Sequence, residues 1–228
     1  MADKLILPQN TRLMGVFLGF VGGSLDVFCH IQYHSLVATQ TGNILLLISD
    51  WHDSNVINTM LRFCSIIFFS LGFLFALHMK EYRKTAYWRV KMLLPLFIGT
   101  LILPFFSRSP LLEVPFIALG TGMMMLTFTG SLIEDHPYVI FMTSGNYRKM
   151  LTALYRIARR EGNIQEYRRQ ALNYGIVVGS FIVGAISLAV LMHFLHEWSV
   201  WIISLNLFLI MSYYIARVKQ LDLQDENI

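Results

Sequence analysis

The chain has 228 residues, of which 55% are hydrophobic and only 14% are charged, and its formal net charge is +4. A soluble globular domain carries about 25% charged residues, so this composition indicates a protein whose solvent is lipid. The length allows six crossings of ~20 residues joined by short loops, with no room for a separate soluble domain. We therefore predict a single membrane domain over residues 1–228.

The charges and the cysteines argue against several other classes of protein. The basic residues lie in loops between apolar runs, and the sequence has no basic and aromatic recognition module, so nucleic-acid binding is not expected. Cys29 and Cys64 fall inside apolar runs without C-x-x-C spacing, and neither a disulfide scaffold nor a zinc site is predicted. The first apolar run is too long for a signal-peptide core, and we expect it to be a permanent span.

Six apolar stretches have the length of a transmembrane helix, ~20 residues for ~30 Å of hydrocarbon. They are residues 12–34, 56–79, 88–106, 112–133, 171–195 and 198–216. The sequence thus predicts an all-α polytopic membrane protein with six transmembrane helices.

Basic residues are distributed unevenly among the connections. Those near the junction of the second and third spans, and between the fourth and fifth, are Lys80, Arg83, Lys84, Arg89, Lys91, Arg148, Lys149, Arg156, Arg159, Arg160, Arg168 and Arg169. The connection of residues 35–55 has no Lys or Arg. The positive-inside rule therefore places both basic loops, and with them both termini, in the cytoplasm.

Two polar segments occupy corresponding places in the two halves of the chain. They are Thr41-Gly42-Asn43 and Thr143-Ser144-Gly145-Asn146. Their glycines are 103 positions apart, the same offset sets Gly19 on Gly122, and a few residues of slippage set Gly72 on Gly179. Because each half has three spans, an odd number, the second repeat is predicted to be inverted relative to the first. The repeats are expected at about 12–106 and about 112–216.

Two sets of residues resemble those of a known family. They are Gly22-Gly23-Ser24-Leu25-Asp26 followed by Thr41-Gly42-Asn43, and Ala118-Leu119-Gly120-Thr121-Gly122-Met123 followed by Ser144-Gly145-Asn146-Tyr147-Arg148. Over nearly the whole chain the sequence is similar to the YoaK-like bacterial inner-membrane proteins, a family of unknown function. The resemblance implies a bacterial inner-membrane location and supplies no reaction. Met124 and Met125 stand where members often carry a Gln-Asn pair, so no polar role is carried over to them.

Asp26 is a carboxylate inside the first span, about eight residues or roughly 12 Å from its outer end. Arg62 lies at a similar depth in the second span, and the two are expected to form an ion pair if these helices are neighbours. One hypothesis makes Asp26 a proton or cation site coupled to a solute, with Arg62 as its exchangeable partner. The alternative is a structural ion pair that fixes two helices.

The two polar segments are also candidate parts of a substrate site. Each combines a hydroxyl that can cap a helix, a glycine and an amide side chain, and so exposes backbone N–H groups at a helix start. The residues concerned are Thr41, Gly42 and Asn43 in the first segment, and Ser144, Gly145 and Asn146 in the second. If both segments enter the membrane from opposite faces, they can share a site near its middle. The alternative is that both are ordinary turns.

Glycines and an amphipathic segment provide further expectations. Gly15, Gly19 and Gly23 share one face of the first span, and Gly175 and Gly179 share one face of the fifth, which predicts close helix packing. Residues 147–170 are basic with apolar positions at helical spacing, and we expect them to lie along the inner membrane surface, against anionic lipid headgroups.

Enzymatic activity is not predicted. The only candidate metal group is His30, His34, Asp50, His52 and Asp53. It lacks a tight ligand motif, and we predict neither a metal nor a cofactor. The favoured hypothesis is a secondary transporter or exporter of a small solute, with membrane lipids, the solute and a coupling ion as partners, and with a homo-oligomer allowed. The alternative is a non-transporting accessory protein that binds lipid or a partner membrane protein.

Overall fold

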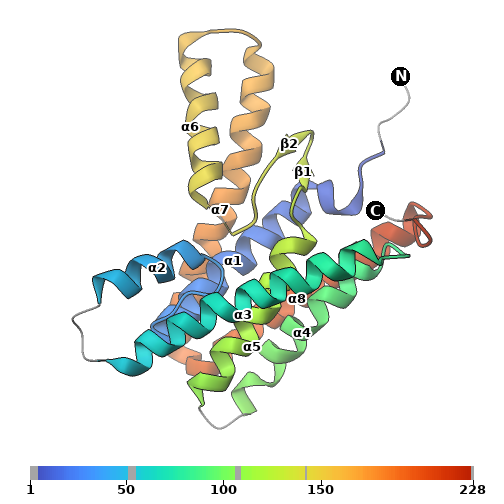
Figure 1. Ribbon diagram of the computed structural model, residues 1–228. Coiled ribbons are helices and arrows are strands. Elements are labelled where there is room, and N and C mark those ends of the chain that lie inside the picture. Colours follow the sequence, from blue (N-terminus) through green and yellow to red (C-terminus); the bar gives the residue numbers. More distant parts are fainter. Residues whose placement is uncertain (1–4, 51–54, 106–108, 142, 227–228) are drawn as a thin grey trace.

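The computed structural model describes residues 5–50, 55–105, 109–141 and 143–226, and this part of the chain is helical apart from one small hairpin (Figure 1). The helices are α1 (Arg12–Tyr33), α2 (Gln40–Ser49), α3 (Val56–Glu81), α4 (Trp88–Ile102), α5 (Pro110–Thr127), α6 (Thr143–Arg159), α7 (Ile164–Leu195) and α8 (Trp201–Gln220), with short 3-10 helices η1 (Pro8–Asn10), η2 (Leu103–Phe105) and η3 (His196–Val200). Strands β1 (Leu132–Ile133) and β2 (His136–Pro137) pair antiparallel, with Leu132 opposite Pro137. The expected all-α class is confirmed.

Five segments are long and apolar enough to cross a membrane, judged by length and composition. They are Arg12–Tyr33, Val56–Glu81, Trp88–Phe105, Pro110–Thr127 and Ile164–Gln220, the last of which contains α7, η3 and α8. Large apolar side chains remain exposed along the outer faces of these helices, among them Phe63, Ile67, Leu71, Leu74, Ile186, Val190, Phe194, Leu205 and Phe208. Such a belt would be unfavourable in water and is suited to lipid.

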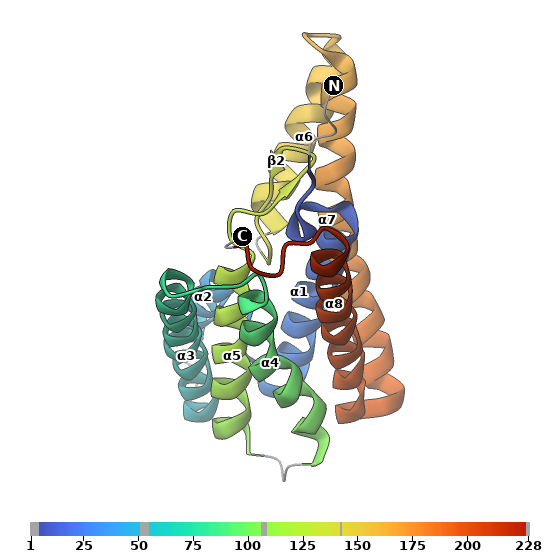
Figure 2. The ribbon, with the colours of Figure 1, turned by 90° about the vertical axis from the view of Figure 1, so that its right-hand side faces the viewer.

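The long helices alternate in direction. Figure 2 shows α1, α4 and α7 running toward one end of the molecule and α3, α5 and α8 running back, so that α1 begins and α8 ends near the other end. α1 packs mainly on α7, and α3 packs mainly on α5. α4 and α8 pack on each other, and α4 also packs on α5 and α8 on α1. α1 and α5 are the most buried of the five apolar segments, so they form the centre of the bundle.

Glycines let α1 and α7 approach until their backbones touch. A Cβ atom added at Gly23 would collide with the carbonyl oxygen of Phe181, and one added at Gly184 would collide with that of Phe20. The expected close packing of the first span is therefore confirmed. The close packing predicted at Gly179 is wrong, because no heavy atom lies within 4 Å of the position that a Cβ atom would take there.

α3 and α5 meet in the same manner. A Cβ atom at Gly72 would collide with the carbonyl oxygen of Leu119, and one at Gly122 would collide with that of Phe69. Small residues at such crossings allow the close backbone contact that stabilises helix pairs in lipid. Gly72 thus has its structural counterpart in Gly184, whereas the sequence comparison had set it on Gly179.

The boundaries of several helices differ from the expected spans, and the largest differences are at the end of α5 and the start of α7. α5 ends at Thr127, whose carbonyl oxygen accepts a hydrogen bond from the Arg89 guanidinium, and the hairpin follows. α7 begins at Ile164, seven residues before the predicted start, because the Asn163 side chain caps it by accepting from the Glu166 N–H at 3.2 Å. Charged residues in the first turns of α7 had hidden this start.

The basic segment forms a helical hairpin with the first half of α7. α6 packs along α7, burying Ala153, and the pair projects away from the bundle (Figures 1 and 2). The predicted amphipathic helix is therefore present, but it is held by α7 and is not an isolated surface helix. Tyr147, Leu151 and Leu154 remain exposed on it.

Candidate functional site

The two polar segments are built by the same side-chain geometry. The Asn43 side chain accepts from the Leu36 N–H at 2.8 Å and donates to the Leu36 carbonyl at 2.6 Å. The Asn146 side chain does the same with Val139, at 3.2 and 2.7 Å. Each asparagine is buried and closes a loop onto the residue seven positions before it. The equivalent residues are 103 positions apart, as predicted from the glycines.

Each segment is also the start of a helix. Thr41 to Asn43 lie in the first turn of α2, and Thr143 to Asn146 lie in the first turn of α6. Backbone N–H groups in a first turn have no partner within their own helix. The expectation that these segments present helix N-termini is therefore confirmed for both.

Asp26 binds the three residues that lead into the first of these helices, Val37, Ala38 and Thr39. Its Oδ1 accepts from the N–H groups of Val37, Ala38 and Thr39 at 3.0, 2.7 and 3.3 Å, and its Oδ2 accepts from the Thr39 hydroxyl at 2.6 Å. The side chain is buried in α1. A carboxylate at a helix N-terminus is stabilised by the helix dipole and by such N–H groups.

The expected ion pair of Asp26 with Arg62 is wrong. The Arg62 guanidinium is bonded to Asp50 at 2.6 Å and to the carbonyl oxygens of His34 and Leu46, both at 3.0 Å. Arg62 therefore fixes the outer ends of α1 and α2 to α3. Hydrogen bonds from Ser49 and Arg62 hold the pKa of Asp50 below its usual value.

The second helix start has no equivalent carboxylate. When the crossing of α5 with α3 is matched to the crossing of α1 with α7, Gly122 corresponds to Gly23 and Leu119 to Phe20. The two residues of each pair are 99 positions apart. The same offset sets Met125 on Asp26. With the crossings matched in this way, the position of Asp26 beside the first helix start is taken by the thioether of Met125 beside the second.

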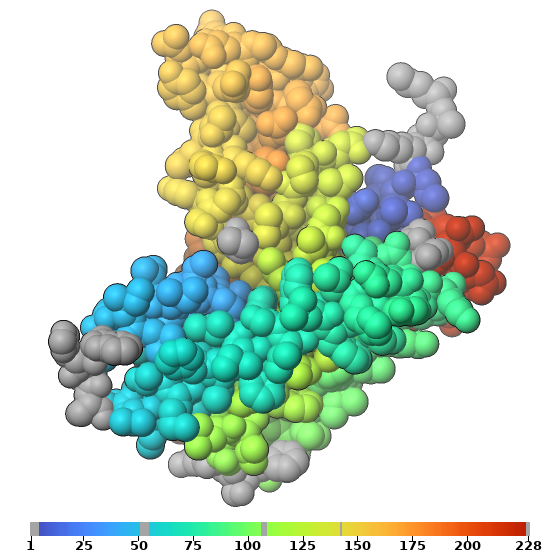
Figure 3. Space-filling model, in the orientation of Figure 1, coloured from blue at the N-terminus to red at the C-terminus, as the bar shows by residue number. Residues whose placement is uncertain are grey.

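The two helix starts face a common cavity of about 380 Å³. It is lined by Ala38, Thr39, Gln40, Thr41, Phe69, Met125, Thr143, Ser144 and Phe181. Thr41 and Ser144 are exposed, so the cavity opens at the surface. In Figure 3, α2 in blue adjoins the yellow chain that leads into α6 on this face of the molecule.

Most of the lining is composed of equivalent residues. Gln40 and Thr41 correspond to Thr143 and Ser144 at the offset of 103. Phe69 and Phe181 are 112 positions apart, which is also the distance between Gly72 and Gly184. The cavity thus lies where the two halves meet. Its lining contains hydroxyls, one amide and two aromatic rings, and no charged side chain.

The predicted site residues have different places in the structure, and only two of them line the cavity. Thr41 and Ser144 line the cavity, whereas Asn43 and Asn146 hold the segments in place. Asp26 and Arg62 act on backbone groups, as described above. Gly42 lies against the Leu36 side chain, and Gly145 has open space around it.

The hairpin beside the second helix start is fixed by a cluster around Glu134. Its carboxylate accepts from Arg12 at 3.0 Å and from Asn173 and Arg169 at 3.4 Å. Partial burial raises the pKa of Glu134. The hydrogen bond from Asn173 and the charges of Arg12 and Arg169 lower it by more than burial raises it, so the pKa lies below the usual 4.5. The carboxylate therefore ties the hairpin to α1 and α7.

Acidification is expected to weaken this cluster. Since the pKa of Glu134 is lower in the folded state, its contribution is present above about pH 4.5 and is lost as the pH falls through the folded-state pKa. Glu134→Gln should lower stability at pH 7 by no more than about 1 kcal/mol and should reduce the further loss below pH 4.5. Unfolding temperatures at several pH values, with the exposed Glu161→Gln as control, measure this; parallel profiles for Glu134→Gln and the wild type would contradict it.

The candidate metal group does not assemble in the described part of the chain. The rings of His30 and His34 are 6.4 Å apart, edge to face, and Asp50 is bonded to Arg62. His52 and Asp53 lie outside the described residues. Among the residues that the structure describes, no three His, Cys, Asp or Glu side chains gather as metal ligands would.

Comparison with known proteins identifies a family. No curated protein and no solved structure matches the chain. One family model, described as "Protein of unknown function (DUF1275)", matches residues 14–213, which include both polar segments and the whole cavity lining. The resemblance drawn from the glycine and asparagine motifs is confirmed, since this is the YoaK family. The chain therefore belongs to DUF1275, a family of unknown function.

Proposed function

We propose that this protein is a secondary transporter or exporter of a small solute, and that the solute binds in the cavity between α2 and α6. The observation that carries the proposal is that the two helix starts, 103 positions apart, line one cavity. Transporters built from inverted repeats place their substrate at such a junction of interrupted helices. A volume of about 380 Å³ is near the lower end for small-molecule sites.

The arrangement of the helices supports two inverted repeats within six crossings, with α7 and α8 crossing separately. α1 and α5, which correspond, run in opposite directions, and so do α3 and α7 (Figure 2). The first repeat is then α1 to α4 and the second is α5 to α8. In each of them the second helix, α2 or α6, does not cross the membrane and the other three do. The first helix of each repeat packs on the third helix of the other repeat, because α1 packs on α7 and α5 packs on α3.

In the same proposal the protein lies in a bacterial inner membrane with both termini in the cytoplasm. The α3–α4 connection and the α6–α7 hairpin carry most of the basic residues, and both lie at the end where α1 begins and α8 ends (Figure 2). Basic loops are retained on the cytoplasmic side. The hairpin would therefore project into the cytoplasm, and only basic residues at the start of α6, such as Arg148 and Lys149, would lie near anionic headgroups.

Asp26 is the candidate coupling group. It contacts the cavity wall through Thr39, so a proton or cation that changed its charge would weaken the bonds that place Thr39, Gln40 and Thr41. Thr41 and Ser144 are then the direct contacts of the solute. The chain has no Walker-type nucleotide loop, and the driving force would be a gradient.

A non-transporting accessory protein is the second candidate. The observation in its favour is the number of bonds that fix the first segment: Ser65 and Asn43 bond Leu36, Gln40 bonds Val37, and Asp26 bonds three N–H groups. Such a segment resists movement. A static protein would use the cavity to hold a lipid or a partner segment.

Thiol accessibility distinguishes these two functions. Thr41→Cys and Ser144→Cys, each in a background with Cys29→Ala and Cys64→Ala, are exposed to a membrane-impermeant thiol reagent from either side of sealed vesicles. A transporter should allow each position to react from both sides, with a balance that ion gradients or candidate solutes shift. Thr41 and Ser144 are preferable to Asn43 and Asn146, because the asparagines are buried and hold the loops closed.

Two control positions calibrate sidedness. Asn55→Cys, at the start of α3, and Arg159→Cys, at the end of α6, lie at opposite ends of the molecule and should each react from one side only. If Thr41→Cys and Ser144→Cys also react from one side each, at rates that no gradient alters, transport is rejected in favour of the accessory protein.

A further inference from the structure

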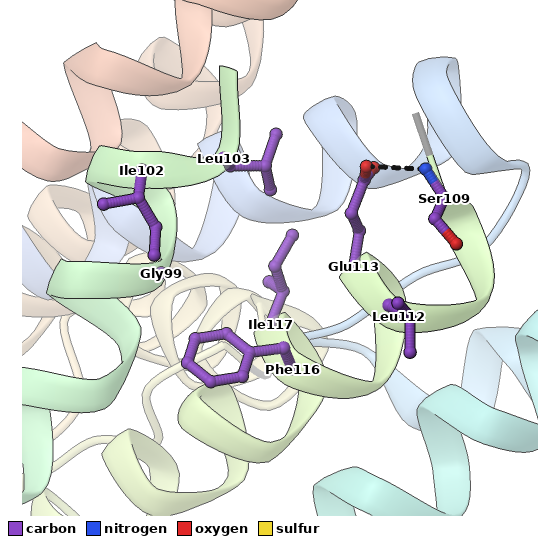
Figure 4. A pocket seen from close by; sticks show the side chains of 8 residues that line it. All are labelled: Gly99, Ile102, Leu103, Ser109, Leu112, Glu113, Phe116 and Ile117. Carbon is purple, nitrogen blue, oxygen red and sulfur yellow. Dashed lines mark hydrogen bonds between the residues drawn. The ribbon is translucent and has the colours of Figure 1, made fainter. Parts of the chain in front are cut away.

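A second cavity, of about 290 Å³, lies between the end of α4 and the start of α5, away from the one described above. Its lining is Gly99, Ile102, Leu103, Ser109, Leu112, Glu113, Phe116 and Ile117. Figure 4 shows these residues on the two adjoining helices, with the Glu113 carboxylate turned toward the Ser109 N–H. Glu113 is the only titratable side chain in a wall that is otherwise almost entirely apolar.

Glu113 has acceptor capacity that the described residues leave unused. One oxygen accepts from the Tyr33 hydroxyl, and the other accepts from the Ser109 N–H at 3.0 Å. A carboxylate offers about four lone-pair sites, so two neutral donors fill about half of them. None of the ion pairs between described residues involves Glu113.

The remaining wall is suited to an apolar body beside that charge. A Cβ atom at Gly99 would collide with the Phe116 ring, so the absence of a side chain at Gly99 lets this ring lie against α4. Aromatic rings attract cations as well as apolar groups. Ile117 and Leu103 complete an apolar surface next to the carboxylate.

We propose that this cavity binds a small organic ammonium ion, with its cationic nitrogen at Glu113 and its apolar body against Phe116 and Ile117. No cation among the described residues pairs with Glu113, so a neutral ligand would leave the carboxylate without a counter-ion in this part of the chain, and an anion would be repelled by it. A hydrated metal ion would gain nothing from the apolar wall. The ammonium group can belong to a free amine or to the amine headgroup of a phospholipid, because both present the same chemistry.

Two probes of the same shape test the charge requirement. Phenyltrimethylammonium carries the cation, and tert-butylbenzene is its neutral isostere. Calorimetric titration of the purified full-length protein should show saturable binding of phenyltrimethylammonium, which meets the carboxylate by charge alone, with an affinity at least about tenfold lower in Glu113→Gln. The weak binding of tert-butylbenzene should be the same in both proteins.

Matched variants separate charge from folding. Glu161→Gln removes an exposed carboxylate between α6 and α7, outside this cavity lining, and should leave phenyltrimethylammonium binding unchanged. Leu112→Arg, at a position 73% exposed, keeps Glu113 but places a competing cation beside it, and should also weaken binding. Unchanged phenyltrimethylammonium affinity in both Glu113→Gln and Leu112→Arg overturns the proposal, as does equal loss of both probes.

Reconstitution identifies the source of the ammonium group. If the natural occupant is a lipid headgroup, phenyltrimethylammonium should bind more weakly in nanodiscs of phosphatidylethanolamine than in nanodiscs of phosphatidylglycerol. Equal affinity in the two lipids indicates a free amine. Neither result bears on the α2–α6 cavity, so this inference and the transport proposal can fail separately.

Discussion

Gly122→Ala is expected to lower the free energy of unfolding by about 3 kcal/mol, the upper part of the range for overpacked sites. The added methyl group would collide with the Phe69 carbonyl oxygen and come within 2.9 Å of the Phe73 nitrogen. Both are backbone atoms of α3, and no rotamer change can move them away. α3 and α5 must separate instead, which loses the contacts along the whole crossing. Unfolding in mixed detergent micelles measures the difference.

The matched control is Gly179→Ala, in which the methyl group meets no heavy atom within 4 Å. Because alanine favours helix by about 1 kcal/mol over glycine in water, this variant should be neutral or slightly more stable. Gly23→Ala, at the equivalent crossing of α1 and α7, should be destabilised as much as Gly122→Ala. If Gly122→Ala were no less stable than Gly179→Ala, the close contact of α3 and α5 would be wrong.

Much of the helical framework could be predicted from the sequence. The starts of α1 and α3 agree with the expected spans to the residue, because each has a capping side chain directly before the apolar run. Thr11 accepts from the Met14 N–H and Asn55 from the Asn58 N–H. Where the polar and apolar pattern does not mark the helix end, as at the start of α7, the prediction missed several residues.

The cavity could be predicted only in part. Its polar half was visible because Thr41 and Ser144 interrupt the hydropathy at repeated positions. Phe69 and Phe181 gave no signal, since an apolar side chain in an apolar helix is the same in the sequence whether it faces lipid, a neighbouring helix or a cavity. Met125 was marked only by the family resemblance, which carried no polar role over to it. Their role follows from the helix crossings, which bring α3 and α7 to opposite sides of the helix starts.

The pairing of Asp26 with Arg62 failed for a different reason. Two opposite charges at similar depth are a reasonable pair, but the sequence does not reveal backbone donors. The chain after α1 turns back and brings three N–H groups to Asp26, while the end of α2 brings Asp50 to Arg62. Both charges therefore have their partners in the connection of residues 35–55, for which only the helix start at Thr41 to Asn43 had been predicted.

Asp26→Ala is expected to lower the free energy of unfolding by about 3–5 kcal/mol. The N–H groups of Val37, Ala38 and Thr39 would lose their acceptor in a buried setting, and each unsatisfied buried donor costs about 1–3 kcal/mol. Asp26→Asn keeps one oxygen in place for these donors and loses the charge and the acceptor for the Thr39 hydroxyl. It should therefore cost only about 1–2 kcal/mol, again measured by unfolding in mixed micelles.

This difference makes Asp26→Asn the useful variant for function. It should leave the protein folded while changing the bonds behind Thr39, so a transporter coupled through Asp26 should lose the gradient dependence of Thr41→Cys labelling. Asp50→Asn, which removes the charge that pairs with Arg62 but leaves the bonds of Asp26 in place, should leave the labelling unchanged. If Asp26→Asn keeps the gradient dependence, Asp26 only holds the chain that leads into α2, and the coupling group lies elsewhere. If Asp26→Ala is as stable as the wild type, this structural role of Asp26 is wrong.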